Sequence, residues 1–203
     1  MDFVNTPSAI VIFLTTIGIS LYTLYKNHNL LYAWILSPRR VYYEKQYHLI
    51  ITSGFLHADL MHLLFNMFTF YFFAFRLEAV IGTVNFLIVY FGSMILSVIS
   101  TILKKKDDYG YGSLGASGAI SGLVFASVLI APNSTMMIMP IPIPIPAYIF
   151  AVLYLVWSYF AAKKAQDMIN HEAHFWGALA GVVLMIILIP GIIGYFISSL
   201  FNS

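Results

Sequence analysis

The chain has 203 residues, of which 61% are hydrophobic and only 9% are charged, whereas a soluble domain carries about 25% charged residues. Charge this sparse, with several apolar runs near 20 residues, predicts a polytopic helical membrane protein with the lipid bilayer as a partner. The net charge of +2 comes without a basic patch, so no nucleic-acid partner is expected. The absence of cysteine excludes disulfides and thiolate chemistry.

We expect six membrane helices within a single domain that covers residues 1–203. The first apolar run has no basic segment before it and no small-residue cleavage site after it, so we interpret it as a retained helix rather than a signal peptide. In chain order, the six expected helices cover about 9–25, 59–77, 84–103, 117–131, 147–162 and 171–189.

Three other segments are not expected to span. An interfacial loop, about 27–56, is too polar to cross a bilayer but carries Trp34 and several Tyr, which is typical of the membrane interface. The run "MPIPIPIP" at 139–146 is a connector that cannot be regular helix, because its prolines recur at every second position. Pro190 and Gly191 mark a break before a short apolar tail.

The fourth expected helix is unusually short. Fifteen residues rise about 22 Å, whereas the hydrocarbon core of a bilayer is about 30 Å thick. If the far end reaches the surface, the near end starts inside the membrane, where non-helical backbone is tolerated only against protein or a wet cavity. The segment 112–116, "GSLGA", is therefore expected to border an internal, water-accessible site.

Ser117 lies at the start of this helix, between Gly115 and Gly118. The free N–H groups and the dipole at a helix N-terminus favour negative charge, which suits an oxyanion. The alternative is that Ser117 is only an N-cap beside a small-residue packing face formed by Gly118 and Gly122.

The sixth expected helix carries His174 followed by Gly177 and Gly181. Glycines at a four-residue step bring two helices close together. Packing this face against the glycines of the fourth helix would place the Ser117 hydroxyl within reach of the imidazole, which can take its proton. Since no Asp or Glu stands at a clear third position, we expect a Ser–His dyad.

His62 and Asn66 share one face of the second expected helix because they are four residues apart. Both side chains can donate a hydrogen bond to developing negative charge. The alternative is that they hold helices together as polar contacts.

The segments "SGFLHADLMHLLFNM", "GASGAISG" and "AHFWGALAG", in this order on three helices, resemble a rhomboid intramembrane serine protease. The resemblance covers about residues 45–185, and it implies an all-α membrane protein, a six-transmembrane-helix rhomboid-like bundle with a core at about 45–190. It implies that Ser117 is the nucleophile and His174 the general base. The implied oxyanion donors are His62, Asn66 and the Ser117 N–H. His57 would support the site at its mouth, Glu78 would be a structural acid, and the supporting glycines would be Gly115, Gly118, Gly177 and Gly181.

What the resemblance implies is an endopeptidase that cuts transmembrane segments of membrane proteins, without cofactor or metal, in the bacterial cytoplasmic membrane. The chain departs from the family at two places. Residues 47–49 read "YHL" where the family often has Trp-Arg, and Ser121 stands where many members carry an aromatic residue stacked on the base. We therefore expect Phe175 or Trp176 to support the imidazole.

Other functions stay open. A rhomboid-like protein that binds transmembrane segments without cutting them usually lacks the serine or the histidine, and both are present here. A metal or haem carrier could use His57, His62, His171 and His174, but no cysteines or clustered acids complete a shell, and "HEAH" lacks the spacing of a zinc-protease helix. A transporter would show an inverted repeat of broken helices, which we do not find.

The basic residues give an expectation for orientation that opposes the family. Nine of the ten lie in loops on the side where the fourth and sixth helices start, and the positive-inside rule makes that side cytoplasmic. They are Lys26, Arg39, Arg40, Lys45, Lys104, Lys105, Lys106, Lys163 and Lys164. Bacterial rhomboids of this plan usually open their active site outward.

Overall fold

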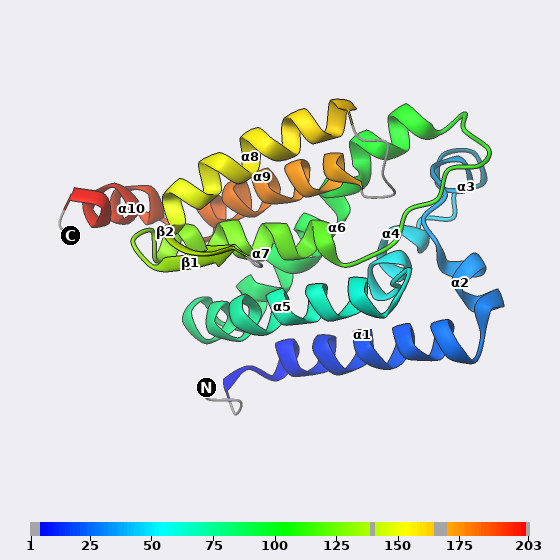
Figure 1. The fold of residues 1–203 in the computed structure, drawn as a ribbon, viewed down its shortest axis with the longest axis horizontal. Coiled ribbons are helices and arrows are strands. Elements are labelled where there is room, and N and C mark those ends of the chain that lie inside the picture. The colour runs from blue at the N-terminus through cyan, green and yellow to red at the C-terminus, as the bar shows by residue number, and fades with distance from the viewer. Residues whose placement is uncertain (1–4, 139–140, 165–169, 202–203) are drawn as a thin grey trace.

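The computed structural model describes residues 5–138, 141–164 and 170–201. It confirms the predicted all-α membrane bundle, because long helices run side by side through the molecule (Figure 1). The six that correspond to the expected spans are α1 (Pro7–Tyr25), α5 (Leu60–Ile81), α6 (Thr83–Lys105), α7 (Ser117–Ile130), α8 (Ala147–Lys164) and α9 (His171–Leu188).

Helix α7 lies at the centre of the bundle. Eleven of its 14 residues are buried, as expected for a helix that is apolar on every side. Among the described residues, α1, α5, α6 and α9 are long and apolar enough to cross a membrane, whereas α7 and α8 offer shorter apolar stretches. At about 21 Å, α7 is shorter than a hydrocarbon core of about 30 Å, so the turn before it lies below the membrane surface when its far end reaches the other side.

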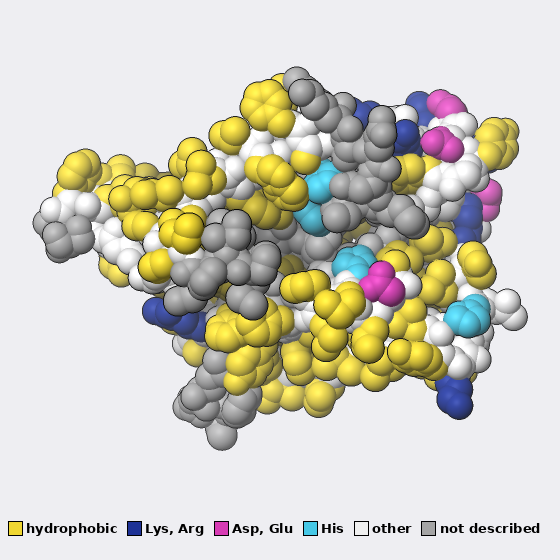
Figure 2. Space-filling view, in the orientation of Figure 1, with side chains coloured by type: hydrophobic (Ala, Val, Ile, Leu, Met, Phe, Trp, Pro, Cys, Tyr) yellow, Lys and Arg dark blue, Asp and Glu magenta, His cyan; other side chains and the backbone are white. Residues whose placement is uncertain are grey.

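The interfacial loop folds into short helices that lie against one end of the bundle (Figure 1). They are α2 (His28–Trp34), α3 (Pro38–Glu44), α4 (Leu49–Thr52) and the 3-10 helix η2 (Ser53–Phe55). Leu36, Val41 and Leu49 bury their side chains with Ile102 of α6 in a small core of their own, which attaches the loop to the bundle. Charged side chains gather mainly at this end, whereas most of the visible face is hydrophobic (Figure 2).

From Ile141 to Pro146 the proline-spaced run is not helical, as predicted, but it is more than a connector. Strand β2 (Ile141–Pro146) pairs antiparallel with β1 (Thr135–Ile138). Successive N–H groups of a strand point to opposite edges, so prolines at alternate positions remove donors from one edge and leave the isoleucine donors for β1. The apolar tail after the break at Pro190 forms α10 (Ile192–Phe201).

Glycine contacts bring α7 and α9 together. A Cβ atom built on Gly177 would lie 2.1 Å from the Gly118 carbonyl oxygen, and one on Gly181 would lie 2.2 Å from that of Gly122. On the other side of α7, a Cβ on Gly118 would lie 2.5 Å from the Ser97 Oγ of α6. The two backbones therefore meet directly, as small residues at a four-residue step allow.

Glu78 joins three helices at the end of the bundle away from the interfacial loop. Its side chain is 1% exposed and accepts hydrogen bonds from the backbone N–H groups of Ser8 (3.1 Å) and Ala9 (2.7 Å) at the start of α1. It also accepts from the Thr83 hydroxyl (2.8 Å) at the start of α6. Negative charge at two helix N-termini is favourable, and this explains a buried acid within a membrane bundle.

Replacing Glu78 by Ala should destabilise the protein strongly, because the buried Ala9 N–H loses its acceptor. We expect a loss of about 2–4 kcal/mol, seen as a lower thermal unfolding midpoint in detergent. Glu78→Gln, which keeps one acceptor oxygen, should lose less. The exposed Glu44 provides the control, since Glu44→Ala should change the midpoint little. An unchanged midpoint in Glu78→Ala would contradict this anchoring role.

Candidate active site

Ser117 and His174 come together across the contact between α7 and α9. Ser117 is the first residue of α7, with Ala116 at the N-cap position, so Ser117 is not itself the cap. The Ser117 Oγ lies 2.7 Å from the His174 Nε2. This hydrogen bond is possible because the contacts of Gly177 with Gly118 and of Gly181 with Gly122 hold the two backbones close.

The turn before Ser117 depends on Gly115. Its φ is +118°, a conformation that a residue with a Cβ rarely adopts, and a Cβ there would lie 2.8 Å from the His62 ring. The Gly115 N–H donates to the Ser53 carbonyl (3.0 Å), and Ser113 exchanges two backbone hydrogen bonds of 3.0 Å with Leu36. The interfacial loop thus holds the turn in place just before the N–H groups at the start of α7.

His62 and Asn66 of α5 line a cavity of about 520 Å³ together with Ser117, Gly115 and His174. The Ala58 N–H points at the His62 Nδ1 (3.5 Å), so the proton of the neutral ring belongs on Nε2, which is then a donor. The Asn66 amide uses one N–H for the His62 carbonyl (2.9 Å) and has a second to offer. The cavity therefore collects hydrogen-bond donors from α5 and α7.

His57 lies in the loop just before α5 and is fully buried. The Ser20 hydroxyl donates to the Phe55 carbonyl (2.8 Å), so the His57 Nδ1, 2.8 Å from the same Oγ, donates to Ser20. The His57 ring stands edge-on to His62, 4.9 Å away. Burial, followed by the nearby His62, lowers the pKa of His57 to about 3. His57 is thus neutral at physiological pH, and it connects α1 to the ring of His62.

An aromatic side chain from another helix lies beside Ser121. The Ser121 Oγ is 2.9 Å from the Tyr154 hydroxyl of α8, and both residues line a cavity of about 250 Å³ with Ser117 and His174. Sequence reasoning missed Tyr154, because it follows Ser121 by 33 positions and no local pattern marks it. The nearest indication in the sequence was that Ser121 stands where many rhomboid proteases carry an aromatic residue.

The ring of His174 has an aromatic neighbour on its own helix. His171, which is the first residue of α9 and is buried rather than at the surface, lies 5.9 Å from it and 5.0 Å from Trp157. Phe175 packs against Tyr159 (5.9 Å) and Trp176 (5.4 Å).

In the described part of the chain, no three His, Asp or Glu side chains come together in a way that would hold a metal ion.

The fold and the site define a class: a helical membrane protein with a serine–histidine pair at the start of a buried central helix. A family model, described as the rhomboid domain, matches residues 44–191. The chain therefore belongs to the rhomboid family and is an integral membrane protein.

Three relatives show how far the similarity extends. A Bacillus subtilis (strain 168) protein, named as a candidate rhomboid protease, YdcA, is 35% identical over 66% of this chain and 64% of its own length. Rhomboid protein 1, mitochondrial, of Saccharomyces cerevisiae is 25% identical over 66% of this chain and 40% of its own. RHOMBOID-like protein 6, mitochondrial, of Arabidopsis thaliana is 40% identical over 38% of this chain and 24% of its own.

Proposed function

We propose that the protein is an intramembrane serine endopeptidase that cleaves transmembrane segments of membrane proteins with Ser117 and His174. The observation that carries this proposal is the 2.7 Å contact between the Ser117 Oγ and the His174 Nε2, beside a cavity that also holds His62 and Asn66. A serine hydroxyl is a weak nucleophile unless a base takes its proton. An imidazole at hydrogen-bond distance is suited to that task.

The proposed reaction begins when a peptide bond of an unwound transmembrane segment reaches the Ser117 Oγ. The oxygen attacks the carbonyl carbon while His174 takes the hydroxyl proton. His62, Asn66 and the Ser117 N–H donate hydrogen bonds to the oxyanion that forms. His174 then gives the proton to the leaving amine, and water, activated by the same imidazole, releases the acyl group from Ser117.

The pair works without a carboxylate in this proposal. The acid nearest to His174 in sequence is Glu172, which contacts Ser100 and Lys104 of α6. The ring is instead oriented by its place on α9 and by the hydrogen bond to Ser117. The mechanism requires no metal and no cofactor, because acyl transfer through a serine needs only the base and the oxyanion donors.

We place the protein in the cytoplasmic membrane of a bacterium, supported by its similarity to the Bacillus subtilis protein.

The test is labelling of the purified protein in detergent with a fluorescent fluorophosphonate, which reacts with activated serines. We expect one mole of label for each mole of folded protein, because a serine paired with a base at hydrogen-bond distance is activated toward the reagent. Folded protein that takes no label would overturn the proposal. It would favour the alternative of a rhomboid-like protein that binds transmembrane segments without cutting them.

A further inference from the structure

The glycine contacts hold α7 and α9 close but leave open what fixes their relative position. A surface of glycines lets backbones approach, yet it has no side chains that interlock. The Ser117–His174 distance depends on how far α9 lies along α7 and how it is rotated. Directional contacts near the start of α9 are therefore the features to look for.

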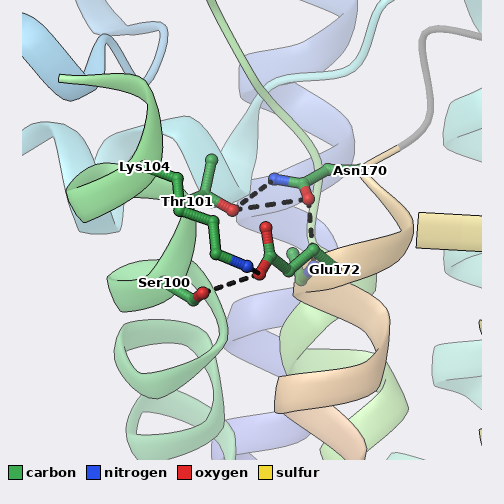
Figure 3. A network of polar contacts seen from close by, with 6 residues as sticks. Ser100, Thr101, Lys104, Asn170 and Glu172 are labelled. Atoms are coloured by element: carbon green, nitrogen blue, oxygen red, sulfur yellow. Dashed lines mark hydrogen bonds and ion pairs between the residues drawn. The ribbon is translucent and has the colours of Figure 1, made fainter. Parts of the chain in front are cut away.

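Asn170, the residue just before α9, makes such contacts (Figure 3). Its Oδ1 accepts from the Ala173 N–H (3.0 Å), which caps the helix. Its Nδ2 donates to the Thr101 Oγ1 of α6 (3.2 Å) and lies 3.4 Å from the Ser113 Oγ. One amide thus links the start of α9, which carries His174, both to α6 and to the turn that precedes Ser117.

Each of these links ends on a well-held partner. Thr101 is 2% exposed, so its hydroxyl is protected from water. Ser113 is held by two backbone hydrogen bonds to Leu36 and precedes Ser117 by one short turn. His174 follows Asn170 by four residues, and its N–H donates to the Asn170 carbonyl (3.2 Å). The amide therefore lies on a short path from the base to the nucleophile.

Glu172 attaches the start of α9 to α6 a second time. Its carboxylate accepts from the Ser100 hydroxyl (2.6 Å) and pairs with Lys104, which is largely exposed (Figure 3). An exposed ion pair contributes little to stability. Glu172 therefore adds to the attachment of α9 to α6, whereas the Asn170 amide also lies against Ser113 of the turn before α7.

We propose that Asn170 is a positioning residue for the Ser117–His174 pair: its amide fixes the start of α9 against both α6 and the turn that precedes the nucleophile. The inference rests on the proposed function, since it concerns the same reaction. Asn170 touches no reacting atom and acts through the placement of His174 and Ser113.

The experiment separates helix capping from positioning by means of Asn170→Ser. Serine caps a helix about as well as asparagine, but its short side chain reaches neither Thr101 nor Ser113. We expect the fluorophosphonate labelling rate of the folded variant to fall about ten- to a hundredfold, because small displacements of reacting groups have effects of this size. The thermal unfolding midpoint should stay near that of the wild type.

Matched variants complete the test. Asn85 of α6 donates to the Ile81 carbonyl (2.9 Å) at the other end of the bundle, so Asn85→Ser should keep the wild-type labelling rate. Asn170→Asp keeps the cap and can accept from both hydroxyls, so it should recover most of the rate. Should Asn170→Ser not fold, Thr101→Val and Ser113→Ala remove the same links from the partner side, and the combined variant should show the same loss.

The outcomes discriminate between the two proposals. A labelling rate in folded Asn170→Ser equal to that of Asn85→Ser would overturn the positioning role and leave the proposed function intact. A rate that falls in proportion to the unfolded fraction would also overturn it, because Asn170 would then be a purely structural residue. A wild-type protein that takes no label would overturn both.

Discussion

Ser117→Ala is expected to abolish both fluorophosphonate labelling and cleavage of a transmembrane reporter segment reconstituted with the protein. Without the hydroxyl no acyl-enzyme forms, and losses for a missing serine nucleophile are at least about 10⁴-fold. The variant should fold normally, since Ser117 bonds to His174 and its replacement leaves the helix contacts of Gly118 unchanged. Reporter cleavage is measured by gel shift and the unfolding midpoint by thermal denaturation.

Two companion variants turn this result into a graded series. His174→Ala should lose labelling and cleavage nearly as completely, because removing either member of a nucleophile–base pair has a similar effect. Asn66→Ala should keep measurable cleavage at a rate lower by about 10²–10³, the loss for one oxyanion donor. Cleavage by Ser117→Ala at the wild-type rate would show that another residue is the nucleophile and that the assignment is wrong.

Gly177→Ala is the second substitution with a large expected effect. The new Cβ would lie 2.1 Å from the Gly118 carbonyl oxygen, and because this neighbour is backbone, it cannot rotate away. Separating α9 from α7 by the required amount displaces His174 from Ser117, so we expect labelling to fall by about 100-fold. Overpacking should also lower stability by about 1–3 kcal/mol, visible in the thermal unfolding midpoint.

Gly18→Ala provides the control for this substitution. Gly18 lies within α1, and a Cβ there meets no atom within 4 Å, so alanine should leave labelling unchanged and favour the helix slightly. If Gly177→Ala labels and unfolds like the wild type, α7 and α9 do not pack as closely as the structure has them.

Much of the fold could be predicted from the sequence because it depends on local pattern. Apolar runs predicted the six main helices, and the proline spacing at 139–146 excluded a helix there. The proximity of Ser117 to His174 was also predictable, since each lies at a fixed step from a pair of glycines. These are properties of neighbouring residues, and the periods of helices and the geometry of glycine suffice to interpret them.

Other features depended on contacts between distant segments. Tyr154 meets Ser121 from α8, Asn170 meets Thr101 across 69 positions, and Ser20 holds the ring of His57 from α1. Each of these residues is ordinary by itself, and nothing in its neighbourhood of the sequence indicates what it will face. The sequence alone determined which segments form the six main helices and which residues carry the candidate chemistry. Only the tertiary structure decided which side chains surround the Ser117–His174 pair, because that depends on how helices far apart in the chain rotate and slide against one another.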